Sequence, residues 1–131
     1  MPSAQGQVPS RRAPATTFEE LLVWQRAKEL SLRVYRITAQ GPLARDLGLR
    51  SQIQRAAVSV MSNIAEGFER NSRAEFARFL AIARGSAGEV RSQVYLAEEL
   101  GYVDAENARI LLSLCREITK MIIALRKSLG A

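Results

Sequence analysis

The chain has 131 residues, of which 47% are hydrophobic, and this is enough for one compact domain with a single core. Its longest apolar run, residues 121–125, is far shorter than the roughly 20 residues that a membrane-spanning helix needs, which excludes a membrane protein of that kind. The 19 Lys and Arg residues outnumber the 13 Asp and Glu residues, so the net charge of +6 favours anionic partners such as nucleic acid.

Residues 1–16 predict a disordered tail, because they combine three of the four prolines with small and polar residues and two arginines. They contain no apolar segment like that of a signal peptide. Together with a single cysteine, Cys115, this favours a cytoplasmic protein whose lone thiol is a small buried hydrophobe. The folded domain is then expected over residues 17–131.

Two helical patterns occupy the first half of this domain. A capping box from Thr17 to Glu20 predicts the start of the first helix, whose apolar residues follow a 3,4 spacing until Gly41-Pro42 ends it. The second helix is expected to begin near Leu49. Its apolar face consists of Leu49, Ile53, Ala57, Val60, Ile64 and Phe68.

Two further patterns occupy the second half. A second capping box, Ser72 to Glu75, predicts the start of the third helix, which ends at Leu100-Gly101, and Asp104 is the expected N-cap of the fourth. No strand-like alternation of useful length interrupts the four segments, and the connections are short. The expected fold is therefore all-α, an antiparallel up-down four-helix bundle.

Glu66 stands where the second helix approaches its end, which is the unfavourable end of the helix dipole for an acid. Arg70, four residues later, and the start of the third helix both compensate a negative charge there, and Asn63 can bridge backbone groups at the same corner. We therefore interpret Glu66 as part of a polar joint. A helix-turn-helix DNA reader is an alternative for this turn, but the flanking segments are too long for that compact unit.

A catalytic role for Glu66 would need a second acid, a histidine or a metal ion nearby. The chain contains no histidine, no Cys-x-x-Cys pair and no phosphate-binding glycine loop. The Glu-x-x-His pairs of di-iron bundles are therefore absent. We expect no enzyme activity, no metal and no cofactor.

The third helix carries a row of small residues on the side away from its large apolar residues. We name this set the small-residue ridge: Ala74, Ala77, Ala81, Gly85, Gly88 and Ser92. Glycine inside a helix costs about 1 kcal/mol relative to alanine, which is easier to understand if another backbone approaches closely. Surplus apolar residues on the first helix, Leu21, Leu32 and Tyr35, also favour self-association. The alternative is a solvated face of good helix formers.

The fourth helix carries a row of cations at spacings of 7, 4 and 7: Arg109, Arg116, Lys120 and Lys127. We name it the basic stripe. It is about 27 Å long and could follow the phosphates of RNA. Glu106 and Glu117 flank it, and no aromatic residue alternates with it along the helix, so an ordinary solvated face remains the alternative.

Three blocks of the chain are similar to a known family. They are S-x-x-x-NIAEG-x-x-R at Ser59, residues 63–67 and Arg70; F-x-x-FL at Phe76, Phe79 and Leu80; and GS-x-x-E at Gly85, Ser86 and Glu89. Across Phe18 to Leu129 the sequence resembles the four-helix-bundle proteins encoded in intervening sequences of bacterial 23S ribosomal RNA. It departs from the usual pattern over residues 41–49, so any contact of that linker in the family does not transfer.

The resemblance implies an antiparallel four-helix bundle that assembles as a homopentamer, without a settled activity. It also implies a polar network of motif residues at the corner between the second and third helices or at a subunit boundary: Ser59, Asn63, Glu66, Arg70, Ser86 and Glu89. A similar fold occurs in the accessory protein of diversity-generating retroelements, a basic pentamer that engages nucleic acid and a reverse transcriptase. The expectation is therefore a non-enzymatic, self-associating bundle that binds RNA or a ribonucleoprotein. The alternative is a protein-interaction adaptor without a nucleic-acid role.

Overall fold

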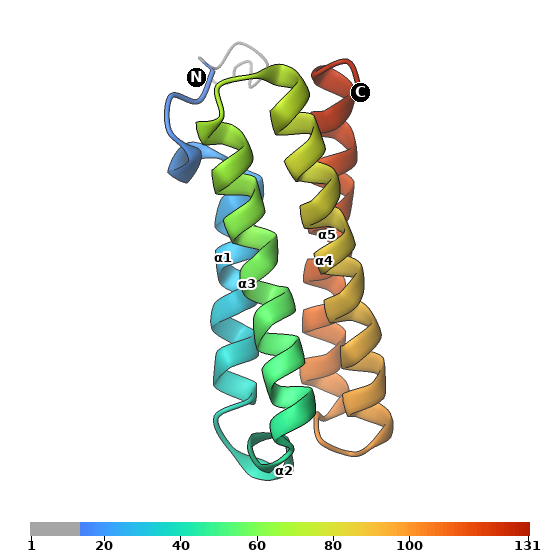
Figure 1. The fold of residues 1–131 in the computed structure, drawn as a ribbon. Helices are drawn as coiled ribbons and strands as arrows, with labels where there is room; N and C mark the ends of the chain where they lie inside the picture. The colour runs from blue at the N-terminus through green and yellow to red at the C-terminus, as the bar shows by residue number, and fades with distance from the viewer. Residues whose placement is uncertain (1–13) are drawn as a thin grey trace, which may run out of the picture.

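A computed structural model describes residues 14–131, so all but the last three residues of the expected tail lie outside the described part of the chain. Within that part, every regular element is helical. The elements are a 3-10 turn η2 (Phe18–Glu20) and the α-helices α1 (Leu22–Ile37), α2 (Gly41–Arg45), α3 (Leu47–Glu69), α4 (Arg73–Glu99) and α5 (Ala105–Ser128). The four long helices, α1, α3, α4 and α5, form the predicted antiparallel bundle (Figure 1).

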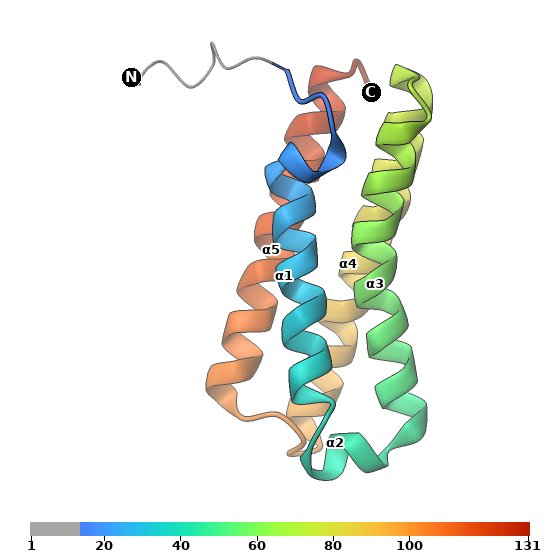
Figure 2. The ribbon, with the colours of Figure 1, turned by 90° about the vertical axis from the view of Figure 1, so that its left-hand side faces the viewer.

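Each long helix packs against the helices that precede and follow it, and α1 also packs against α5, so the bundle closes on itself. Figure 2 shows α1 and α5 side by side, with the short α2 at the opposite end of the bundle from η2 and the end of α5. No helix within residues 14–131 is long and apolar enough to cross a membrane.

Two of the predicted helix starts are confirmed by their caps. Ser72 Oγ accepts a hydrogen bond of 3.2 Å from the backbone N–H of Glu75, and Asp104 Oδ1 accepts one of 2.7 Å from that of Asn107. Between α3 and α4 the chain reverses at Asn71, whose φ of 56° is the left-handed conformation that asparagine adopts more readily than most residues. The α3–α4 corner is therefore as tight as the sequence predicts.

The first two helices begin at other places than predicted. The Thr17 side chain makes no capping bond, and the Glu20 carboxylate instead accepts a bond of 2.9 Å from the backbone N–H of Thr16. This local bonding closes the turn η2, so α1 begins only at Leu22. The second long helix begins at Leu47 rather than Leu49, because the Asp46 side chain caps it.

The connection between the first two long helices contains the unpredicted helix α2. Helix α1 ends at Ile37, and the Thr38 hydroxyl then donates to Val34 O at 2.8 Å and accepts from Gln54 Nε2 at 2.9 Å. Pro42 lies in the first turn of α2, where its missing N–H costs nothing, and Leu43 is fully buried. A short helix thus anchors the linker to the bundle.

Asp46 also joins the two connections at this end of the bundle, since Tyr102 Oη donates to Asp46 Oδ2 at 3.2 Å. This bond, with some desolvation, raises the pKa of the Tyr102 phenol.

The core lies along the bundle axis and consists of the predicted apolar stripes. Its largest fully buried side chains are Leu30, Leu43, Ile53, Ile64, Leu80, Leu111, Ile118, Ile122, Val34, Val60, Val90 and Val94. Cys115 is buried among them, and burial raises the pKa of its thiol to about 12. The prediction that Cys115 is a small buried hydrophobe is confirmed.

Candidate functional site

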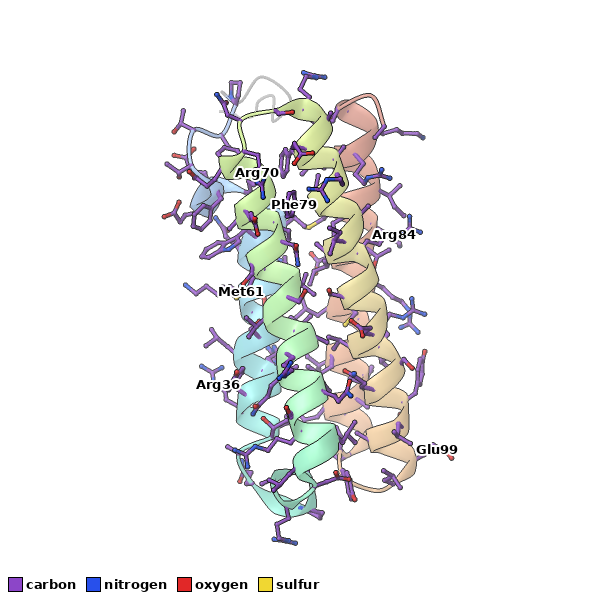
Figure 3. The ribbon with its side chains drawn as sticks, in the orientation of Figure 1. Arg36, Met61, Arg70, Phe79, Arg84 and Glu99 are labelled. Atoms are coloured by element: carbon purple, nitrogen blue, oxygen red, sulfur yellow. The ribbon has the colours of Figure 1, made fainter. Side chains whose placement is uncertain are left out.

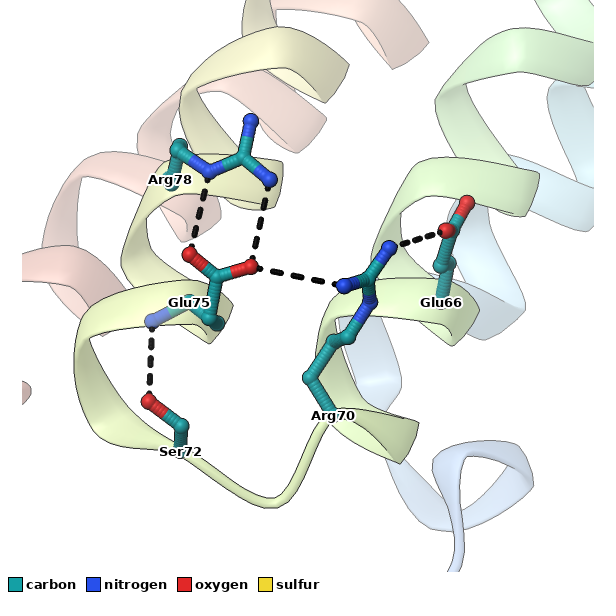
Figure 4. A network of polar contacts seen from close by, with 5 residues as sticks. All are labelled: Glu66, Arg70, Ser72, Glu75 and Arg78. Atoms are coloured by element: carbon teal, nitrogen blue, oxygen red, sulfur yellow. Dashed lines mark hydrogen bonds and ion pairs between the residues drawn. The ribbon is translucent and has the colours of Figure 1, made fainter.

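The α3–α4 corner holds a chain of ion pairs between the two helices (Figure 4). Glu66 Oε2 accepts from Arg70 Nη2 at 2.9 Å, so the predicted partner of Glu66 is confirmed. Arg70 Nη1 lies 3.7 Å from Glu75 Oε1, and Glu75 also accepts two hydrogen bonds from Arg78. Arg70 thus links an acid of α3 to an acid of α4.

Glu75 and Arg78, the two members of this chain on α4, shift each other's pKa. The hydrogen bond from Arg78 lowers the pKa of Glu75, and the same pair raises the pKa of Arg78. Phe79 provides an apolar surface below them, with Arg70 Cζ 4.9 Å and Arg78 Cζ 4.6 Å from its ring centroid. The sequence motif contains Phe79 but gives no sign that its ring supports two guanidinium groups, because that contact forms only when α4 folds back on α3.

Gly67 explains why the helices meet so closely at this corner. It is buried inside α3, and a Cβ atom at this position would lie 2.6 Å from Phe79 Cβ and 3.2 Å from a ring carbon of Phe76. Real Cβ atoms essentially never show the shorter distance. Gly67 therefore serves the packing of α3 on α4 and does not end the helix, which continues to Glu69.

A second polar group lies further along the same helix pair. Ser59 Oγ and Ser86 Oγ share a hydrogen bond of 2.8 Å between α3 and α4. Asn63 Nδ2 donates to Ser59 Oγ at 2.9 Å and to Ser59 O at 2.8 Å. Asn63 therefore bonds back within α3 and does not bridge the corner as expected.

The six motif residues thus do not form one continuous network. The structure joins Ser59, Asn63 and Ser86 in one group and Glu66 with Arg70 in another. Glu89 is exposed and makes no hydrogen bond or ion pair with any residue of 14–131. Within one protomer the spacing along α3 separates the corner from the Ser59 level by about 10 Å, and a network of these residues at a subunit boundary stays a prediction.

The small-residue ridge lies on the outward face of α4. Five of its six residues are exposed, and Ala77 is buried against α5, where its carbonyl accepts a bond of 3.0 Å from Arg126 Nε. A Cβ atom on Gly85 or Gly88 would have no neighbour within 4 Å. No backbone of the same protomer uses the space that these two glycines leave free.

Large apolar side chains are exposed next to the ridge and on α1. Ile82, Tyr95 and Leu96 belong to the outward side of α4, while Leu32 and Tyr35 extend from α1. Leu21 is half-buried and lines a groove between the start of α1 and α5. The surplus apolar residues of the first helix therefore remain partly outside the core of the protomer.

All four residues of the basic stripe are exposed on α5. Arg109 is held by two hydrogen bonds from its guanidinium to Glu106, of 3.1 and 2.8 Å, and this pair lowers the pKa of Glu106. Glu117 is drawn to the opposite side, because it pairs with Arg26 of α1 at 3.0 Å. The cations after Arg109 in the stripe are thus not neutralised by the two acids that flank them in sequence.

An aromatic ring lies beside the stripe, contrary to the sequence-based expectation. Arg116 Nη2 donates to Tyr95 Oη at 3.0 Å, and the Tyr95 side chain is 44% exposed. The two residues are 21 positions apart and come from different helices, so the spacing within the fourth helix carries no signal of this contact. Only the packing of α4 on α5 brings them together.

Within residues 14–131, no three Cys, Asp or Glu side chains come close enough together to hold a metal ion. Glu66 and Glu75 of the α3–α4 corner are each paired with arginine, and the pair with Arg78 lowers the pKa of Glu75. Chemically, the corner can hold two helices in register, while the ridge and the stripe can present surfaces to other molecules.

The fold and these surfaces define an antiparallel four-helix bundle protein with an ion-paired α3–α4 corner and exposed outward faces on α4 and α5. The sequence model of the family described as 23S rRNA-intervening sequence protein matches residues 19–124. The chain therefore belongs to the family of 23S rRNA-intervening sequence proteins, as the resemblance predicts.

A solved structure is similar over most of the bundle. It is a crystal structure of a protein of unknown function from the S23 ribosomal protein family of Bacteroides thetaiotaomicron, with a TM-score of 0.74 and 26% sequence identity. The match covers 81% of this chain and 99% of that one. None of the curated proteins compared with the chain matches it.

Proposed function

We propose that the protein is a non-enzymatic helical bundle that self-associates as a homopentamer and binds RNA or a ribonucleoprotein. The observation that carries self-association is the open space in front of Gly85 and Gly88 on the outward face of α4. Each glycine costs about 1 kcal/mol relative to alanine in a helix interior, and nothing in the protomer offsets this cost. A helix of a second copy that approaches the ridge closely would offset it.

Apolar neighbours of the ridge support the same conclusion. Ile82 and Leu96 are exposed on the same side of α4, and burial of such side chains between copies is favourable at about 25 cal/mol per Å². The ridge would let the backbones of two copies approach closely, and these side chains would add buried apolar area to the contact. The number of five copies rests on the resemblance to the family and is the part of the proposal that a mass measurement decides.

RNA is supported as the partner by the net charge of +6 and by the exposed basic stripe on α5. The runner-up function is a protein-interaction adaptor without a nucleic-acid role. The exposed side chains of Leu32 and Tyr35 on α1 favour it, because they could contact another protein.

Light scattering coupled to gel filtration tests the self-association. We expect the wild-type chain to elute with five times the protomer mass of 14.5 kDa, about 72 kDa. Gly85→Leu combined with Gly88→Leu fills the open space without a clash inside the protomer, so the helical circular dichroism should persist while the mass falls.

The matched control is Gln52→Leu combined with Arg55→Leu, two exposed positions of α3 with the same spacing. This variant should keep the wild-type mass. A wild-type mass of one protomer at micromolar concentration would refute self-association. An equal loss of assembly mass in both variants would show that the ridge is not the surface at which the copies meet.

A further inference from the structure

Seven cationic side chains gather along the line where α4 and α5 pack together. We name them the basic seam: Arg73, Arg84 and Arg91 of α4, and Arg116, Lys120, Arg126 and Lys127 of α5. The seam contains the last three residues of the basic stripe and adds four arginines, three of them from the neighbouring helix. It is therefore a feature of the tertiary structure and not of one helix.

Hydrogen bonds across the two helices locate the seam. Arg73 Nη2 donates to Ser128 O at 3.1 Å, and Arg126 Nε donates to Ala77 O at 3.0 Å. These two bonds place Arg73 and Arg126 at the same end of the antiparallel pair of helices, which is one end of the seam. The contact between Arg116 and Tyr95 lies nearer its other end.

The remaining arginines of α4 follow the same side of the helix. Arg84 and Arg91 come seven and fourteen residues after Ala77, and residues seven apart lie within about 20° of each other around a helix. The Cys115 thiol on α5 is affected chiefly by burial, but the charges of Arg91 and Arg116 both act to lower its pKa. Figure 3 shows Arg84 on the side of α4 that faces away from α3.

The positive charge of the seam is not compensated locally. All six ion pairs within residues 14–131 use other arginines, so no seam residue takes part in one. Glu75 is drawn toward α3, and Glu106 and Glu117 pair with Arg109 and Arg26. Glu98 comes seven residues after Arg91 and so lies on the same side of α4.

Composition leads to the same conclusion about where the excess charge lies. Without the seven seam residues, the chain has 12 Lys and Arg against 13 Asp and Glu, since 19 less 7 is 12. The seam thus holds seven of the 19 Lys and Arg residues of the chain, more than a third of them. Such a concentration attracts a polyanion more strongly than the same charge spread evenly.

The two ends of the seam differ in shape. At the Arg73 end, Ala74, Ala77 and Ala81 line an open hollow of about 570 Å³ beside Arg73 and Arg126. The small side chains leave the guanidinium groups accessible. At the other end, Tyr95 is 44% exposed and its hydroxyl contacts Arg116, and an exposed ring beside a cation is a surface on which a base can stack.

We propose that the basic seam binds single-stranded RNA, with its arginines and lysines on the phosphates and one base on the ring of Tyr95. The proposal rests on the proposed RNA partner and names the site. The α4 part of the seam, from Arg73 to Arg91, is about 27 Å long, enough for several nucleotides. A single strand fits better than a duplex, because duplex RNA keeps its bases stacked away from an aromatic side chain.

The test measures binding of a fluorescent single-stranded oligouridine of about 20 nucleotides by anisotropy, in salt from about 50 to 200 mM. The seam variant is Arg84→Gln with Arg91→Gln and Arg116→Gln. The control is Arg36→Gln with Arg45→Gln and Arg55→Gln, which removes the same amount of charge. These three arginines of α1, α2 and α3 are exposed and form no ion pair within residues 14–131.

We expect the seam variant to bind at least about tenfold more weakly, and the control to stay within about threefold of the wild type. The slope of log affinity against log salt should fall by about 2 in the seam variant, since each phosphate contact to a single strand contributes about 0.7. Equal losses in both variants would overturn the proposal, because net charge alone would then explain binding.

Tyr95 separates stacking from hydrogen bonding. Tyr95→Phe keeps the ring and loses the bond to Arg116, so its RNA affinity should match the wild type within about twofold. Tyr95→Leu removes the ring and should weaken binding severalfold. Equal affinity of the leucine variant and the wild type would refute the stacking part of the proposal.

Light scattering on the same samples distinguishes the two proposals. A homo-oligomer that fails to bind the oligouridine at about 50 mM salt refutes the seam proposal, leaves self-association intact and favours the adaptor. A monomer that binds as described refutes self-association and supports the seam. Tighter binding of duplex RNA, or of vesicles of phosphatidylcholine and phosphatidylserine, than of the single strand would overturn the proposed ligand.

Discussion

Glycine occurs in α3 and α4 for two different reasons. At Gly67 a methyl group would lie 2.6 Å from Phe79 Cβ, whereas at Gly85 and Gly88 it would meet nothing within 4 Å. The first glycine is required by the packing of the protomer itself. The other two are not, and the proposed contact with a second copy would account for them.

The side chains around the two regions support this difference. Near Gly67, Glu66 and Glu75 each have an arginine partner and Phe79 lies beneath the guanidinium groups, so these two acids are paired within the protomer. Along α4, Glu89 has no partner within residues 14–131, and Ile82 and Leu96 are exposed. A satisfied corner serves the fold, and an unsatisfied face is available for binding.

The strongest test of this comparison is Gly67→Ala. Forced overpacking costs about 3 kcal/mol at its upper end, and the gain in helix propensity returns about 1 kcal/mol, so we expect a net loss of about 2 kcal/mol. The measurement is urea unfolding followed by circular dichroism. A variant as stable as the wild type would show that α4 moves aside without cost.

Gly85→Ala and Gly88→Ala are the matched substitutions on the other side of the comparison. Each should raise the stability of the isolated protomer by about 1 kcal/mol, because alanine is the better helix former and finds open space. Light scattering at decreasing protein concentration should show that the assembly dissociates more readily. An assembly as tight as the wild type would contradict close approach at the ridge.

The smallest effect is expected for Glu66→Ala. The Glu66–Arg70 pair is half-exposed and spaced i,i+4, and such pairs contribute about 0.3 to 0.5 kcal/mol. The control is Glu29→Ala, which breaks the equally exposed i,i+4 pair with Arg33 in α1. Urea unfolding should give similar small losses for both.

A larger result for Glu66→Ala would sharpen the comparison. A loss well above that of the control, or a change in assembly mass, would mean that Glu66 contacts a second copy in addition to Arg70. The same stability and mass as the wild type would contradict the interpretation of Glu66 as part of the joint.

The sequence by itself determined the number and order of the long helices and most of the core. The 3,4 spacing of apolar residues is a local consequence of helix geometry, so the stripes around Ile64, Leu80 and Ile118 could be assigned without a structure. The caps at Ser72 and Asp104 were predictable for the same reason, because a capping bond joins residues three positions apart.

The helix predicted to start at Thr17 begins with the 3-10 turn η2 and becomes α-helical only at Leu22, and the helix predicted to start near Leu49 begins two residues earlier, at Leu47. The Glu20 carboxylate accepts a hydrogen bond from the backbone N–H of Thr16 instead. The Asp46 side chain accepts one from Tyr102, which is 56 positions away in the sequence. Helix α2 was not predicted either, since five residues are too few to show the helical period of apolar residues.

Only the tertiary structure decided what the polar and small residues do. It showed that Gly67 admits Phe79, that Ser59 bonds to Ser86, and that Tyr95 lies beside Arg116. These contacts join residues 12, 27 and 21 positions apart on different helices, so their geometry depends on how the helices pack, which local spacing does not encode. The sequence identifies the surfaces of each helix, and the packing of helices determines which of those surfaces meet.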